Sequence, residues 1–156
     1  MSIINAREHL SKWNREQDIL EFDVSSATVE LAAKALNCDQ ARIAKTLTYK
    51  LDNRVIMIVA AGDARVDNKK YKAFFEAKAK MLHPEEVETL VGHQIGGVCP
   101  FGVKKDVEIY LDKSLKRFDS VFPACGSSHS AIELSCQELE TYSESNQWID
   151  VCKDWQ

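Results

Sequence analysis

The sequence predicts a single mixed α/β domain, and two features of the chain support this fold class. Segments with helical periodicity alternate with segments of strand character along the 156 residues. Several predicted strands are joined by turns too short for a parallel crossover, so the sheet is expected to mix parallel and antiparallel pairs. We find no repeat, linker or low-complexity tract, and residues 1–156 are therefore expected to fold as one unit.

The first half of the chain is expected to contain three helical segments and three strands. Apolar residues at helical spacing and local capping residues predict the helical segments Ser2 to about Trp13, Val29–Leu36 and Asp39–Ala44. Strand character predicts the strands Ile19–Val24, Lys45–Leu51 and Arg54–Ala61. Thr28 is a suitable N-cap for the second helix, and Asn37 is a suitable stop. Asp52-Asn53 is a hairpin-like turn between the last two strands.

The second half begins with a predicted loop, Gly62–Val66. A lysine-rich helix is predicted next, which Asp67 or Asn68 caps and which carries lysines up to Lys80. Two further helices are predicted over Glu85–Leu90, with Pro84 in its first turn, and over Gln137–Tyr142. The predicted strands are Val107–Leu111, Ser120–Pro123, Ala131–Ser135 and Trp148–Val151.

The composition limits the class of protein. It is 45% hydrophobic and 28% charged, as in globular proteins, and no apolar run reaches the ~20 residues that cross a membrane. The N-terminal residues lack the pattern of a signal peptide, so we expect a cytoplasmic protein without a membrane partner. A net charge of −4 argues against a protein that coats DNA or RNA through a broad basic surface. Five cysteines at irregular spacings indicate reduced thiols.

The segment Gly92–Gly102 is the most informative part of the chain, because it holds four glycines and a proline in eleven residues. Glycine permits a close backbone approach to a ligand. The N–H groups of Gly96, Gly97 and Val98 could therefore hold a carbonyl oxygen as negative charge develops on it. The alternative is an ordinary tight turn between a helix and the next strand.

Lys45 is the best single candidate for chemistry. Strand alternation places it at the head of an apolar row with Leu47, Tyr49 and Leu51. Partial burial would lower the pKa of its amine and make it a proton acceptor or a tuned donor. The alternative is a lysine whose amine reaches solvent at the end of a strand.

Three segments together resemble one family: Ala41–Leu47, the glycine-rich loop, and Cys125–Leu134 with its small-residue turn. Over nearly its whole length the chain resembles the YbaK/ProX aminoacyl-tRNA deacylases, which are related to the editing domain of bacterial prolyl-tRNA synthetases. The resemblance implies a curved, partly barrel-like mixed sheet flanked by helices. It also implies hydrolysis of the ester of a mischarged tRNA, with tRNA for proline as the expected partner and prolyl-tRNA synthetase as a second candidate partner.

The resemblance also assigns roles to residues. The implied catalytic residues are Lys45, Gly96, Gly97 and Gly126. The implied substrate-binding residues are Thr28, Thr46, Val98, Pro100, Phe101, Ser127, Ser128 and His129. Family members that remove cysteine carry aspartate where this chain has Ala131, which favours alanine or 2-aminobutyrate as the substrate amino acid. Neither a metal nor another cofactor is expected.

Several alternatives stay open at this point. Arg65, Lys69, Lys70 and Lys72 either contact the tRNA backbone or form a solvated helix face. The chain could also be a binding module that kept the fold and lost the chemistry. A thiol hydrolase that uses Cys125 with His129, or Cys99, is a third class. A zinc site built from His83, His93 and Cys99 fits no compact ligand spacing.

Overall fold

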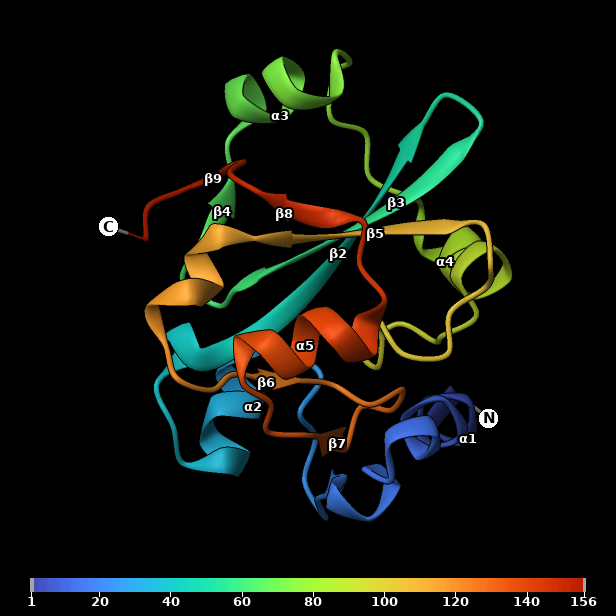
Figure 1. Cartoon of the computed structure of the whole chain (residues 1–156), viewed down its shortest axis with the longest axis vertical. Helices are drawn as coiled ribbons and strands as arrows, with labels where there is room; N and C mark the ends of the chain where they lie inside the picture. Colours follow the sequence, from blue (N-terminus) through green and yellow to red (C-terminus); the bar gives the residue numbers. More distant parts are fainter. Residues whose placement is uncertain (1, 156) are drawn as a thin grey trace.

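A curled five-stranded sheet forms the centre of the computed structural model, which describes residues 2–155 (Figure 1). In spatial order its strands are β6 (Phe122–Pro123), β2 (Ile43–Leu51), β3 (Arg54–Ala61), β5 (Val107–Asp112) and β8 (Gln147–Ile149). Strands β2 and β3 are antiparallel, whereas the pairs β2–β6, β3–β5 and β5–β8 are parallel. The mixed sheet that the sequence predicts is therefore confirmed.

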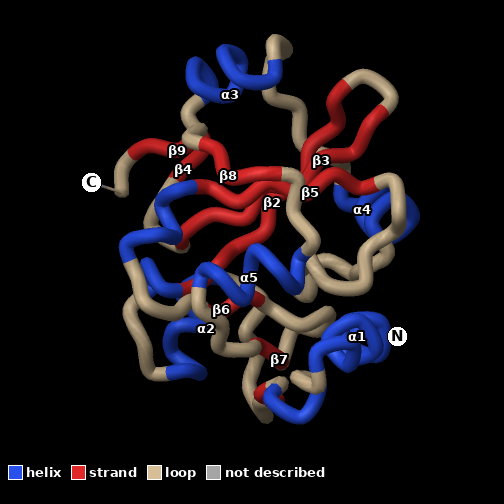
Figure 2. The backbone as a smooth tube through the Cα atoms, viewed as in Figure 1, coloured by secondary structure: helices blue, strands red, loops and turns tan. Residues whose placement is uncertain are grey.

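Helices lie on both sides of this sheet. Helix α3 (Asn68–Phe75) lies at one end of the molecule, and α1 (Ser2–Leu10) and α2 (Val29–Leu36) lie at the other, with the sheet between them (Figures 1 and 2). The other α-helices are α4 (Pro84–Val91) and α5 (Cys136–Ser143). Short 3-10 helices are η1 (Ser11–Trp13), η2 (Glu16–Asp18), η3 (Gln40–Arg42) and η4 (Lys113–Arg117). No helix within residues 2–155 combines the length and the apolar character needed to cross a membrane.

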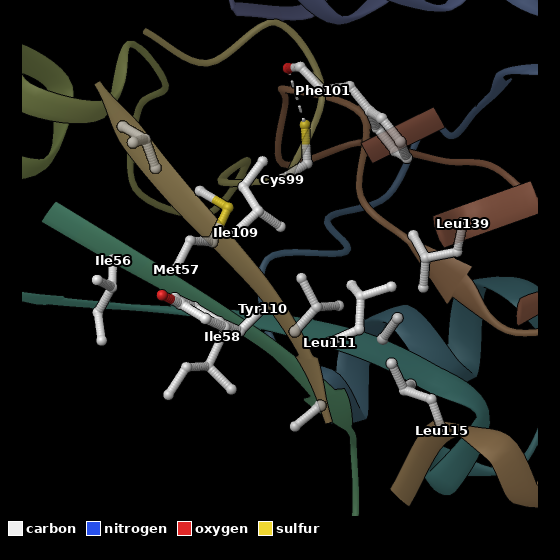
Figure 3. Packing of buried hydrophobic residues seen from close by; sticks show 14 of the residues in the cluster. Ile56, Met57, Ile58, Cys99, Phe101, Ile109, Tyr110, Leu111, Leu115 and Leu139 are labelled. Carbon is white, nitrogen blue, oxygen red and sulfur yellow. Dashed lines mark hydrogen bonds between the residues drawn. The ribbon is translucent and has the colours of Figure 1, made fainter. Parts of the chain in front are cut away.

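The core forms where the central strands are covered on both faces. Strand β3 is buried from Ile56 to Ala61, which explains its continuous apolar sequence. On one face Tyr71 of α3 contacts Tyr49, with 5.2 Å between the ring centroids. On the other face Leu111 lies in one buried cluster with Leu115 and Leu139 (Figure 3).

Local capping chemistry explains why the starts of two helices agree with the sequence prediction. The Thr28 hydroxyl accepts a hydrogen bond from the N–H of Leu31 at 3.1 Å, and Asn37 ends α2 with a left-handed φ of 54°. The carboxylate of Asp67 likewise accepts the N–H of Lys69 at the start of α3. Both starts depend on residues adjacent in sequence, which is why they are predictable.

Several sequence predictions were wrong in their extent. The predicted helical segment Asp39–Ala44 is only η3, with Ile43 and Ala44 in β2, and the predicted strand Ala131–Ser135 is only the short strand β7. The strand predicted over Ile19–Val24 is reduced to β1 (Leu20–Glu21), which pairs with β7 (Ser130–Ala131). The predicted loop Gly62–Val66 contains β4 (Arg65–Val66), which pairs with β9 (Cys152–Lys153) beyond the predicted last strand. The lysine-rich helix ends at Phe75, so Lys78 and Lys80 lie outside it. The first helix is α-helical only to Leu10 and continues as η1.

A long-range pairing accounts for the early end of α3. The N–H of Lys50 donates to the carbonyl of Lys80 at 2.8 Å, and the N–H of Leu82 donates to the carbonyl of Thr48 at 3.2 Å. Residues 80–82 must be extended to make these bonds along the edge of β2. A helix through Lys80 is therefore incompatible with the sheet.

Candidate active site

A cavity of about 320 Å³ opens beside the outer edge of β2. Residues 26–29 and Ala32 around the start of α2 line it, together with residues 43–48 of β2. The other lining residues are Met81, Leu82, Pro84 and Val87 before and within α4, Ile95, Gly96 and Val98 of the glycine-rich loop, and Phe122, Ala124, Ser130 and Ala131. Of the described residues that line it, Lys45 is the only charged one. The cavity is thus a mainly apolar space with one cation in its wall.

The edge of β2 is interrupted where it borders the cavity. Strand β6 pairs with β2 at Ile43 and Ala44, and residues 80–82 bond to Thr48 and Lys50. Even-numbered residues of β2 present their backbone groups to this edge, because the carbonyl of Thr48 and the N–H of Lys50 both point there. Thr46 lies between the two flanking segments, so its backbone groups face the cavity.

The side chain of Thr46 adds a second polar group at the same place. Its hydroxyl is buried and has no hydrogen-bond partner within the described part of the chain. A buried hydroxyl without a partner is costly, so packing alone does not explain a threonine at this position. Thr46 therefore combines an unpaired strand edge with an unpaired hydroxyl in one wall of the cavity.

Lys45 is held on the other face of β2 by backbone carbonyls. Its Nζ donates to the carbonyl of Ala64 and, at 3.5 Å, to the carbonyl of Gly62. The side chain is half-buried, and desolvation lowers the pKa of the amine below its usual value. The sequence prediction of a partly buried lysine with a depressed pKa is confirmed. Among the described residues, these two carbonyls accept two of the three hydrogens of the ammonium. The third hydrogen is left for another acceptor.

The two glycine segments meet backbone to backbone. A Cβ added to Gly97 would lie 2.5 Å from the nitrogen of Ser127 and 2.6 Å from the carbonyl carbon of Gly126. Only glycine allows this approach. The N–H of Gly97 donates to the carbonyl of Gln94 at 3.0 Å within its own turn. Gly97 and Gly126 thus join the two loops, while Ile95, Gly96 and Val98 are the loop residues that line the cavity.

Gly96 also adopts a backbone conformation that favours glycine, with φ of 93°. A Cβ at this position would lie 3.4 Å from the Cβ atoms of Ala27 and Ser128, so space is limited as well. The neighbouring Ile95 lines the cavity and is 61% exposed. The loop therefore presents a bare backbone at Gly96 beside an exposed apolar side chain.

The serine-rich turn is fixed to the segment before α2. Ser26 donates both its N–H, at 2.6 Å, and its hydroxyl, at 3.1 Å, to the carbonyl of Ser128. The N–H of Phe22 donates to the carbonyl of His129 at 2.8 Å. The Ser127 hydroxyl bonds to that of Ser130 at 2.8 Å. Among the described residues, Ser130 and Ala131 line the cavity, whereas Ser127, Ser128 and His129 are not part of its lining.

Pro100 and Phe101 belong to the glycine-rich loop but lie outside the lining of the cavity as the described residues define it. Phe101 is fully buried, and its carbonyl bonds to Nε2 of His93 at 2.6 Å. These two residues therefore support the loop from the core. Their predicted contact with substrate has no counterpart in this geometry, because the core packing of Phe101 keeps its ring away from the cavity.

The comparisons with known proteins agree with this geometry. A family model described as "Aminoacyl-tRNA editing domain" matches residues 24–142. The chain belongs to the aminoacyl-tRNA editing domain family. The match covers the start of α2, the Lys45 strand and both glycine segments, so every wall of the cavity lies within the editing domain.

Three relatives of this editing domain are informative. The uncharacterized protein YwhH of Bacillus subtilis is 57% identical over the full length of both chains. The candidate Cys-tRNA(Pro)/Cys-tRNA(Cys) deacylase EbsC of Enterococcus faecalis is 32% identical, over 72% of this chain and 70% of EbsC. The crystal structure of a candidate trans-editing enzyme for prolyl-tRNA synthetase superposes with a TM-score of 0.88 at 25% identity, over 97% of both chains.

The thiols of the editing domain are poorly placed for nucleophilic catalysis. Cys99 and Cys125 are fully buried, and burial raises the pKa of Cys99 to about 12 and raises that of Cys125. The ring of His129 bonds through Nδ1 to the hydroxyl of Ser128 at 2.9 Å. Cys99 lies 3.5 Å from Nε2 of His93, but both groups are in the core. The geometry disfavours a thiol hydrolase.

We expect iodoacetamide to leave the activity of the editing domain intact. Cys38 and Cys136 are partly exposed and should be alkylated before Cys99 and Cys125, because attack requires an accessible thiolate. Peptide mass spectrometry measures the order of labelling, and residual hydrolysis measures its effect. Cys125→Ser is expected to keep most of the activity. Loss of activity in parallel with labelling of Cys99 or Cys125 would contradict this prediction.

The other predicted sites are placed as follows. Within residues 2–155, no three His, Cys, Asp or Glu side chains gather in a way that could hold a metal ion. Arg65, Lys69 and Lys72 are exposed at or near α3. Lys70 instead donates to the carbonyl of Cys152 at 2.9 Å and pairs with Asp150 at 3.3 Å. Its ammonium is therefore engaged within the protein.

Met81 and Leu82 are among the cavity residues that sequence reasoning missed, because it placed this region after a continuous helix. A signal was present at Pro84, since the residue before proline avoids helical geometry. His83 is extended, with φ of −70° and ψ of 148°. This proline indicates that the chain is not helical at His83. It does not indicate that residues 80–82 pair with the edge of β2.

Proposed function

We propose that this protein is a trans-editing deacylase that hydrolyses the ester bond of a mischarged tRNA. The observation that carries the proposal is the cavity itself, which the half-buried Lys45, the open strand edge at Thr46 and the Gly96 backbone line together. Its size suits an aminoacyl group, and the family supplies the class of substrate. Charged tRNA as the substrate would place the enzyme in the cytoplasm.

Lys45 is proposed to stabilise the negative charge that develops on the ester carbonyl oxygen. Two ammonium hydrogens are directed to the carbonyls of Gly62 and Ala64, and the third is available to the substrate. A preoriented donor of this kind acts without reorganisation during the reaction. Water can then attack the carbonyl carbon, assisted by the neighbouring ribose hydroxyl of the substrate.

The pH dependence of hydrolysis tests this role of Lys45. The lysine is active when protonated, so the acceleration over spontaneous hydrolysis should fall as pH rises through the pKa of Lys45. Desolvation lowers that pKa, so the fall should begin below the usual range of lysine. Single-turnover rates between pH 6 and 9, corrected for the uncatalysed rate, measure it. An acceleration that rises with pH would show that Lys45 acts as a base instead.

Thr46 and the small residues of the cavity are proposed to select the amino acid. The strand edge of Thr46 can bond to the amino and carbonyl groups of the aminoacyl ester. Thr28 and Val98 line the same space, together with the small side chains Ala27, Ala32, Ala44, Ala124 and Ala131. A space bounded by methyl groups favours alanine or 2-aminobutyrate, and cysteine remains a close alternative in size.

The loops contribute in two ways. Gly96 and Val98 are proposed to face the reacting carbonyl, since they line the cavity. Gly97 and Gly126 are proposed to keep the two loops in contact. Ser128 and His129 tie the second loop to the segment before α2, and Ser127 braces the turn through the Ser130 hydroxyl.

The exposed cations Arg65, Lys69 and Lys72 are proposed to contact the tRNA backbone. We expect Lys69→Ala and Lys72→Ala each to reduce the slope of log affinity against log salt by about one. Fluorescence anisotropy of labelled tRNA at several salt concentrations measures the slope. Lys105→Ala is the control, because Lys105 is equally exposed but lies in the loop before β5. Equal slopes in all variants would remove these residues from the interface.

Hydrolysis of tRNA for proline, charged separately with alanine, 2-aminobutyrate, cysteine, serine and proline, tests the function directly. Rapid loss of a wrong amino acid with proline spared is the expected result. Absence of hydrolysis together with measurable tRNA binding would favour the alternative, a non-catalytic module that binds the tRNA end or the synthetase. Titration with prolyl-tRNA synthetase tests whether the synthetase is a partner.

A further inference from the structure

The segment that holds Lys45 is itself held by an ion pair outside the cavity. Gly62 and Ala64, whose carbonyls accept the Lys45 amine, flank Asp63. Both carboxylate oxygens of Asp63 bond to Arg117, Oδ1 to Nη2 at 2.6 Å and Oδ2 to Nη1 at 3.0 Å. Such a two-pronged pair fixes orientation as well as distance.

Arg117 is fixed independently of Asp63. Its Nε donates to the carbonyl of Ser114 at 2.9 Å, and Nη1 donates to the carbonyl of Trp155 at 2.8 Å. The guanidinium also lies over the rings of Trp155 and Phe118, at 5.1 and 4.8 Å from their centroids. A guanidinium with this many partners is a rigid anchor for the carboxylate that it binds.

The loop is also confined on its other side. A Cβ on Gly62 would lie 2.0 Å from the carbonyl oxygen of Gln40 and 2.8 Å from Cγ1 of Val29. Residues 62–64 thus lie between the start of α2 and η3 on one side and Arg117 on the other. A shift of Asp63 would move the two carbonyls that orient the Lys45 amine.

We propose that Asp63 and Arg117 are positioning residues for Lys45: their ion pair holds the carbonyls of Gly62 and Ala64 where they direct the amine toward the substrate. This inference rests on the proposed function of Lys45. Neither residue lines the cavity, and the two are 54 positions apart in sequence.

The charges around the amine support the same coupling. Asp63 and Cys152 act to raise the pKa of Lys45, while Arg65 and desolvation lower it. Removal of the Asp63 charge should therefore lower the pKa of Lys45 further, in addition to freeing the loop. The two effects have separate readouts.

The test compares Asp63→Asn with Glu108→Gln. The Arg54–Glu108 pair, at 3.3 Å, joins β3 to β5 at the hairpin end and serves as a matched ion-pair control. NMR of the protein labelled with ¹³C at the lysine ε carbons follows the titration of Lys45, whose signal is assigned with Lys45→Arg. Single-turnover kinetics on the preferred aminoacyl-tRNA supply the rate and the half-saturating concentration.

In Asp63→Asn we expect the Lys45 titration to move to lower pH and the maximal rate to fall by about tenfold, with half-saturation unchanged. The alkaline limb of the pH–rate profile should move in the same direction. Glu108→Gln should leave the Lys45 titration, the maximal rate and the alkaline limb as in the wild type. Asp63→Glu keeps a carboxylate for Arg117, so it should recover part of the rate and part of the shift in the Lys45 titration. If the loop had only a structural role, the Lys45 titration would show no such recovery.

An unchanged Lys45 titration and an unchanged rate in Asp63→Asn would overturn the inference, as would a shifted titration without a change in rate. If Asp63→Asn fails to fold by circular dichroism, Arg117→Lys, which keeps the charge and loses the fork, replaces it. If the wild type hydrolyses no ester, the proposed function fails, yet the NMR titration still shows whether Asp63 controls the amine.

Discussion

Lys45→Ala is expected to lower the single-turnover rate of ester hydrolysis by about 100-fold or more. The substitution removes the one charged group of the cavity wall that the described residues provide. Binding of the tRNA should change little, because the backbone contacts are proposed to lie at Arg65, Lys69 and Lys72. Rapid-quench measurement of the remaining aminoacyl-tRNA gives the rate, and anisotropy gives the affinity.

Lys50→Ala is the matched control for this substitution. Lys50 belongs to the same strand, but its side chain is 47% exposed and its amine lies 3.7 Å from Glu86. An exposed pair of this kind contributes little, so near wild-type hydrolysis is expected. Equal rates for Lys45→Ala and the wild type would leave the loops and the substrate hydroxyl as the source of catalysis.

The second large effect is expected for Gly97→Ala. The added methyl carbon would meet the backbone of Gly126 and Ser127 at 2.5 to 2.7 Å, and neither is a flexible side-chain end. The two loops must separate, which should cost about 1–3 kcal/mol of stability and at least tenfold in rate, since Gly96 moves with its neighbour. Thermal unfolding and single-turnover hydrolysis measure the two effects.

Gly92→Ala separates backbone strain from loop contact. Gly92 ends α4 with φ of 101°, but a Cβ there would meet only Lys104, at 3.6 Å or more. This variant should lose roughly 1 kcal/mol of stability and keep its rate. A similar rate loss in both variants would mean that any strain in this loop impairs catalysis, and that the contact of Gly97 with Gly126 has no particular role.

The candidate active site differs from the sequence expectation in how its parts are used. Lys45, Thr46, Gly96 and Val98 meet at one cavity, as the resemblance implies. Phe101 is a core residue instead, because the loop turns inward after Val98. The carbonyl of Phe101 bonds there to the ring of the buried His93. A glycine-rich sequence predicts close approach but does not tell whether the approaching partner is a ligand or another loop.

Local chemistry determined much of this protein from the sequence alone. Thr28, Asn37 and Asp67 set helix boundaries through bonds to residues within four positions, and alternation along β2 placed Lys45 on a partly buried row. The cavity, by contrast, exists because β6 and residues 80–82 flank Thr46 from distant parts of the chain. Strands as short as β4 and β9 have no periodicity to detect and form only when each meets the other. The anchoring of the Lys45 loop by Arg117 is likewise a tertiary contact, because side-chain pairing across 54 residues leaves no local pattern.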